Sequence, residues 1–172
     1  MDIKVRDITL IALFTSLLFV VKYAFGFIVG FELVTFFVIA LAIFLPFKIS
    51  ITTTLFFVMI TGIMYGMGTW WIMYWFIFPT SSLTTTILKK YLKNNIIVGL
   101  WSFFWGFSIL FWYALHDLVI FGSGSALASM SSALLPNGLG AIGNLVAGVL
   151  LYYPLEIFFK KINIERNKKI LW

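Results

Sequence analysis

Charged and ionisable side chains are rare inside the long apolar runs of this sequence, so each one is a candidate for chemistry. Lys22 lies within the first apolar run, Glu32 opens the second, and His116 and Asp117 follow the fifth. A charge at membrane depth is costly and is retained mainly where it binds a solute or pairs with another charge. These side chains, together with Asn144 in the last run, therefore predict a polar binding site.

The depth of Lys22 leaves two interpretations open. It lies about fifteen residues, or roughly 22 Å, from the inner end of its predicted helix, in the outer third of a bilayer. Its ammonium group either extends to the outer headgroups or faces a water-filled pocket. Glu32 and Asp117 fall at the same level, where one of them either pairs with Lys22 or receives a donor group of a ligand. Asn144 bonds either across helices or to a ligand.

Aromatic side chains cluster around a predicted turn at the same level. The stretch Gly62–Trp75 has three glycines within seven positions and no charge, which favours a tight turn. Its rings are of the kind enriched at membrane interfaces. They form either an aromatic belt alone or a belt that is also the wall of a ligand site. The candidate wall residues are Trp70, Trp71, Tyr74 and, on the fifth predicted helix, Tyr113.

The composition predicts an integral membrane protein. The 172 residues are 62% hydrophobic and only 10% charged, against about 25% charged in soluble proteins. The chain has no cysteine, which excludes a disulfide scaffold and a thiolate metal site. The net charge of +6 comes from predicted membrane loops rather than from a basic patch with exposed aromatics, so we expect no nucleic-acid partner.

Hydropathy predicts an all-α membrane protein, a bundle of six transmembrane helices. The predicted spans are residues 8–29, 32–46, 49–65, 70–88, 96–116 and 138–159. We expect one domain over residues 1–162 and a short basic tail over 163–172. If the N-terminus is cytoplasmic, eleven of the twelve basic residues fall on the inside and none in the outer loops, which places both termini in the cytoplasm. The eleven basic residues on the inside are Lys4, Arg6, Lys48, Lys89, Lys90, Lys93, Lys160, Lys161, Arg166, Lys168 and Lys169.

Residues 117–137 are small, uncharged after Asp117 and too weakly hydrophobic to predict a span. As an outer loop this segment would fold over the mouth of the bundle as a lid, or it would form an interfacial re-entrant segment. The polar candidates all lie toward the outer side, and the inner half is predicted to be almost purely apolar. This pattern favours a binding cup, open outward and closed at the bottom, over a channel.

Enzyme classes are poorly supported. The serines of Gly122-Ser123-Gly124-Ser125 follow His116 in the chain, the reverse of the order in intramembrane serine proteases. No phosphate-binding loop of the GxxxxGK[ST] type occurs, so ATP hydrolysis must come from partners. A lone histidine without cysteines does not make a metal site. We therefore expect no catalytic residue, no metal and no cofactor.

The short basic N-terminus, the run DITLIALFTSLLFV and the six predicted helices without an ATPase motif resemble the substrate-binding S component of energy-coupling factor (ECF) vitamin transporters. The resemblance covers essentially the whole chain. It implies a bacterial cytoplasmic-membrane protein that captures a vitamin or related small heterocycle at its outer face. Its partners would be a transmembrane coupling subunit and two ATP-binding subunits. The family's Ala-xxx-Ala contact patch corresponds to Ala12 and Ser16, which otherwise pack within the bundle. The alternative function is a self-sufficient small-solute carrier or channel.

Overall fold

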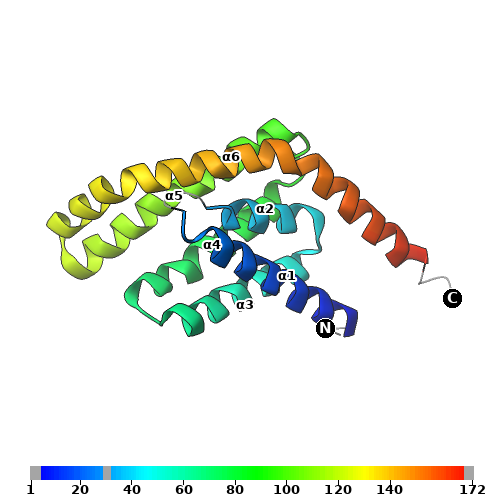
Figure 1. The fold of residues 1–172 in the computed structure, drawn as a ribbon, viewed down its shortest axis with the longest axis horizontal. Coiled ribbons are helices and arrows are strands. Elements are labelled where there is room, and N and C mark those ends of the chain that lie inside the picture. The colour runs from blue at the N-terminus through cyan, green and yellow to red at the C-terminus, as the bar shows by residue number, and fades with distance from the viewer. Residues whose placement is uncertain (1–4, 29–31, 169–172) are drawn as a thin grey trace.

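The computed structural model describes residues 5–28 and 32–168, with side chains up to residue 161. The described chain is helical, without strands, as the sequence predicted (Figure 1). Its six helices are α1 (Val5–Phe25), α2 (Val34–Phe44), α3 (Phe47–Tyr65), α4 (Thr69–Leu88), α5 (Asn95–Phe121) and α6 (Ser123–Lys168).

The structure overturns the prediction for residues 117–137. They do not form a loop that could serve as a lid: they are the end of α5, Gly122 and the first turns of α6. The two helices form a long antiparallel hairpin whose tip extends beyond the other helices (Figure 1). Gly122 joins them with φ +88°, a conformation that side chains other than glycine rarely adopt. Further along, Gly148 lies so close to Gly99 that an added Cβ would meet its Cα at 2.5 Å.

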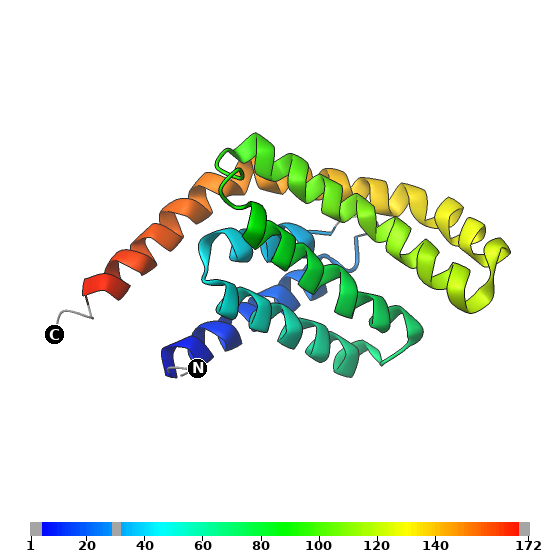
Figure 2. The same ribbon diagram turned by 180° about the vertical axis from the view of Figure 1, so that it is seen from behind.

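α6 is bent along its length, and its last turns run away from α5 (Figures 1 and 2). Pro154 lies inside the helix, where it lacks the N–H of a regular helical hydrogen bond. Beyond it, the Phe159 ring stacks on Phe44 of α2 with centroids 5.2 Å apart, and reaches Phe14 of α1 at 5.6 Å. The bend therefore lets one helix pack against two separate parts of the bundle.

The connections between helices lie at two opposite ends of the molecule. The α3–α4 turn and the tip of the α5–α6 hairpin lie at one end in both views (Figures 1 and 2). The α2–α3 and α4–α5 connections and the described chain ends lie toward the other. Described lysines and arginines other than Lys22 belong to these latter segments, which we call the basic end. The opposite end is called the tyrosine end, after Tyr65, Tyr74 and Tyr113.

Four helices are long and apolar enough to cross a membrane among the described residues. They are α1, α3, α5 and the Ser123–Lys161 part of α6. α2 has 11 residues, a length of about 16 Å, roughly half the hydrocarbon thickness of a bilayer. α4 has 20 residues but is rich in tryptophan and threonine. The described residues therefore contain four helices that could span a membrane. The predicted count of six spans is larger than this number.

The prediction of an almost purely apolar inner half is wrong. Hydroxyl side chains are buried between α3, α4 and α5 near the basic end, among them Ser50, Ser82, Thr85 and Ser102. Ser50 and Ser82 share a hydrogen bond of 2.9 Å, and Trp101 donates to Thr85 at 2.8 Å. Ser102 donates to a carbonyl of its own helix. Such satisfied hydroxyls hold neighbouring helices together without placing a charge in the core.

Candidate binding site

Lys22 lies in the last turn of α1 and reaches toward α4. Its Nζ donates a hydrogen bond of 3.0 Å to the Tyr74 hydroxyl. The same ammonium group lies 5.0 Å from the ring centroid of Tyr74 and 5.7 Å from that of Tyr65 at the end of α3. Both distances suit a cation–π interaction. Lys22 is therefore held inside the tyrosine end by two helices, rather than extended away from the bundle.

A pocket of about 370 Å³ opens beside this ammonium group, lined by Lys22, Gly26, Tyr65 and Trp70. A lysine ammonium has three N–H donors, and Tyr74 takes one of them. Within the described residues, no carboxylate lies at ion-pair distance from Lys22. The predicted ion pair with Glu32 or Asp117 is therefore not formed. The pocket offers a positive charge with spare donors, flanked by aromatic rings.

Tyr113 extends this cluster to α5, because its side chain interacts with that of Tyr74. Tyr74 also packs edge-on against Trp70, with centroids 5.2 Å apart. The Lys22 cluster, as we call Lys22, Tyr65, Trp70, Tyr74 and Tyr113, thus draws on α1, α3, α4 and α5. Three of the four predicted wall residues belong to it.

Glu32 and Asn144 form a second polar contact, between the start of α2 and the middle of α6. One Glu32 carboxylate oxygen accepts from the Thr35 backbone N–H at 2.9 Å, and the other accepts from Asn144 Nδ2 at 2.7 Å. Asn144 Oδ1 accepts from the Phe36 N–H at 2.8 Å. Asn144 is fully buried, and it makes the cross-helix bonds that the sequence suggested as one alternative. Glu32 lies near enough to Lys22 to interact with it electrostatically, without a direct bond.

Trp71 faces α3 instead of the pocket. Its indole N–H donates to the Val58 carbonyl at 2.7 Å. Its ring covers Gly62, where an added Cβ would lie 2.3 Å from Nε1. This contact fixes the first turn of α4 against α3 and so positions Trp70 and Tyr74 beside Lys22. A ligand-facing role for Trp71 stays a prediction.

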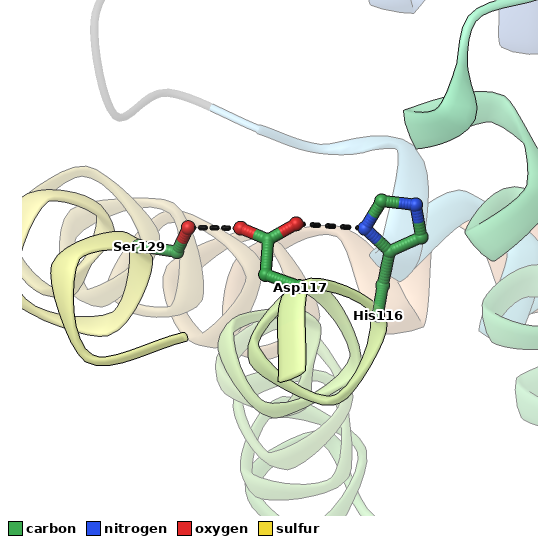
Figure 3. Close-up of polar contacts among 3 residues, drawn as sticks. All are labelled: His116, Asp117 and Ser129. Atoms are coloured by element: carbon green, nitrogen blue, oxygen red, sulfur yellow. Dashed lines mark hydrogen bonds and ion pairs between the residues drawn. The ribbon is translucent and has the colours of Figure 1, made fainter. Parts of the chain in front are cut away.

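His116 and Asp117 lie on the α5–α6 hairpin (Figure 3). The Asp117 carboxylate sits between two partners. One oxygen contacts His116 Nδ1 at 2.7 Å, and the other accepts a short hydrogen bond from Ser129 of α6. In a hydrolytic triad the serine bonds to the imidazole. Here it bonds to the carboxylate, so the imidazole does not activate Ser129.

Two residues of these sites were missed from the sequence. Tyr65 belongs to the Lys22 cluster, and its position in the aromatic turn, level with Lys22, was the available signal. Ser129 was hidden because its segment was interpreted as a loop. On α1, Ala12 and Ser16 are both exposed, and Ser16 bonds only to the Ala12 carbonyl. This placement excludes packing inside the bundle and leaves the pair accessible to a partner.

In the described part of the chain, no group of three histidine, cysteine, aspartate or glutamate side chains is placed to hold a metal ion. The chain was also compared with known proteins. It matches no protein-family model, and neither the curated proteins nor the solved structures give a match.

Proposed function

We propose that this chain is the solute-binding subunit of an ECF-type importer. It spans the membrane with six helical segments and has both termini in the cytoplasm. The Lys22 pocket, at the tyrosine end, faces outward. The resemblance of the whole sequence to S components supports this assignment, as does the separation of the basic end from the pocket, since positive loops remain in the cytoplasm. The two ATP-binding subunits and the coupling subunit supply the energy for transport.

The observation that carries the proposal is the ammonium group of Lys22 in an open pocket of about 370 Å³. A lysine kept at this depth without a paired carboxylate is costly unless a ligand interacts with it. The rings of Tyr65 and Trp70 beside it favour a flat ring system, which gains binding energy by stacking. The substrate is therefore a vitamin-sized heterocycle whose anionic or hydrogen-bond-accepting group contacts Lys22.

The exposed Ala12–Ser16 face of α1 is proposed as the contact with the coupling subunit. Small side chains one helical turn apart let a partner helix approach closely. Because both side chains are exposed, the bundle does not have to open before a partner binds.

Native mass spectrometry of the protein, purified without added solute, tests the binding function. We expect a single small molecule to remain bound and to be lost in Lys22→Met. Reconstitution in liposomes tests the class of transporter. Uptake that requires the coupling and ATP-binding subunits supports the proposal, whereas uptake by this chain alone would identify a self-sufficient carrier.

A further inference from the structure

Outside the Lys22 pocket, a second and very different cavity lies between α4 and α5. It has a volume of about 280 Å³ and is lined by apolar side chains and one imidazole. The two cavities share no lining residue. The walls include Ile72, Met73 and Phe76 from α4 and Trp112, His116 and Val119 from α5. We call this cavity the α4–α5 groove.

His116 gives the groove a specific chemistry. The His116 side chain is only 4% exposed, and its Nε2 atom is buried without a hydrogen-bond partner. Nδ1 is occupied by the Asp117 carboxylate, which only accepts hydrogen bonds, so the proton lies on Nδ1. In the neutral ring, Nε2 then has an unused lone pair. Leaving such an acceptor buried and unpaired destabilises the protein, and a ligand that donates to it removes this cost.

Asp117 is itself held in place by Ser129 of α6, so the imidazole has a fixed orientation (Figure 3). The ring projects from α5 on the side away from Ser129 (Figure 3), and Nε2 points away from the carboxylate. The Asp117 carboxylate thus sets the tautomer of His116, and the hydrogen bond from Ser129 helps to fix the direction of the unused acceptor.

We propose that the α4–α5 groove binds a small, lipid-soluble ring compound with one hydroxyl or N–H donor, of the phenol or indole class. The donor bonds to His116 Nε2, and the ring packs against Trp112 and Phe76. Ile72, Phe76 and Val119 are all exposed on the outer surface of the helices. In a membrane-spanning chain this surface faces lipid, so the ligand enters from the hydrocarbon phase. Val119 is 77% exposed and is free to change rotamer as the ligand reaches the covered nitrogen.

His116 is the only histidine in the chain, so ¹⁵N-histidine labelling gives a single imidazole to observe. The protein, purified with a histidine-free tag and placed in lipid nanodiscs, is titrated with 4-propylphenol. 4-Propylanisole, which has nearly the same shape but no donor, is the matched control. We expect the phenol to move the Nε2 resonance in a saturable way and the anisole to leave it unchanged. No movement with the phenol, or equal movement with both compounds, overturns the proposal.

Substitutions at two exposed positions on α5 test whether the change in the Nε2 resonance arises from binding in the groove. Val119→Trp fills the groove and is expected to abolish the saturable change, whereas Leu118→Trp, at a residue that does not line the groove, is expected to retain it. A phenol response that survives in Val119→Trp would also overturn the proposal. Lys22→Met should leave the response intact, so this test is independent of the solute-binding function proposed for the Lys22 cluster.

Discussion

The Lys22 cluster and the His116–Asp117–Ser129 cluster differ in which hydrogen-bonding groups their members leave without a partner. The Lys22 cluster collects side chains from α1, α3, α4 and α5, and it presents a cation with spare donors to an open pocket. His116, Asp117 and Ser129 come from the α5–α6 hairpin alone and bond to each other, apart from one buried nitrogen. The charge without a paired carboxylate suits a polar solute from water, and the single acceptor suits a ligand from lipid.

The clusters also differ in how they are supported. The first lies among helices joined by contacts between residues far apart in the chain, such as Lys22 with Tyr74 and, at the start of α2, Asn144 with Glu32. The second depends on one hairpin. Substitutions that remove a long-range support should therefore cost more stability than substitutions within the hairpin.

Asn144→Ala should have the largest effect. It leaves the Phe36 N–H and one Glu32 oxygen without their protein partner, at a cost of about 3 kcal/mol in the free energy of unfolding. Reversible unfolding in mixed detergent micelles measures this loss. Asn137→Ala is the control, because the Asn137 amide bonds only to a carbonyl of its own helix. Equal stability of the two variants would show that Asn144 does not support the start of α2.

Lys22→Met tests the cluster itself, with little change in folding. We expect the affinity for the solute that remains bound during purification to fall by about 100-fold, or about 2.8 kcal/mol. The bound fraction in native mass spectrometry and equilibrium dialysis measure this change. Lys160→Met is the control, since Lys160 is exposed and pairs with Glu156 on the same helix. If Lys22→Met retained its affinity for the solute, the Lys22 ammonium group would not be part of the binding site.

Gly62→Ala should displace the Trp71 ring, because the new methyl group would lie 2.3 Å from its Nε1. Overpacking of this kind costs about 2 kcal/mol in the free energy of unfolding. It should also weaken solute binding, since Trp71 fixes the helix turn that carries Trp70 and Tyr74. Gly124→Ala, at a position with open space, should leave stability unchanged or slightly raised. A fully stable Gly62→Ala variant would mean that α3 and α4 separate here at no cost.

Ser129→Ala should have the smallest effect, about 1 kcal/mol in the free energy of unfolding, because it removes one hydrogen bond within the hairpin. Freed from Ser129, Asp117 should let the imidazole reorient, which would broaden the single histidine resonance. Ser132→Ala, which loses only a bond to its own helix, should do neither. If Ser129→Ala lowered the free energy of unfolding as much as Asn144→Ala, the two clusters would not differ in how strongly they are supported.

The sequence predicted the existence of all six helices and the approximate bounds of the first four, because long apolar runs and short turns between them are strong signals. It failed for residues 117–137. Their weak hydropathy and many small side chains resemble a loop, but α5 provides a helical partner along this segment, and glycine contacts such as Gly99 with Gly148 hold the two helices together. Tertiary packing of this kind cannot be read from local composition.

For the site, the sequence named Lys22, Trp70, Tyr74 and Tyr113 as candidates, and the structure brings these four side chains together. Depth in a bilayer can be counted along each helix. Counting does not give the rotation of a helix about its axis. It therefore did not show that Trp71 packs on α3, that Glu32 binds Asn144 in preference to Lys22, or that His116 lies in a different cavity. Each of these outcomes depends on which face of a helix meets its neighbour.

The Phe159 ring, stacked on Phe44 and touching Phe14, fastens the part of α6 beyond Pro154 to the middle of α1. The helix proposed to meet the coupling subunit is thereby fastened to the last turns of the chain. A force on the C-terminal part of α6 would therefore reach α1 through Phe159, and not through a residue of the Lys22 cluster.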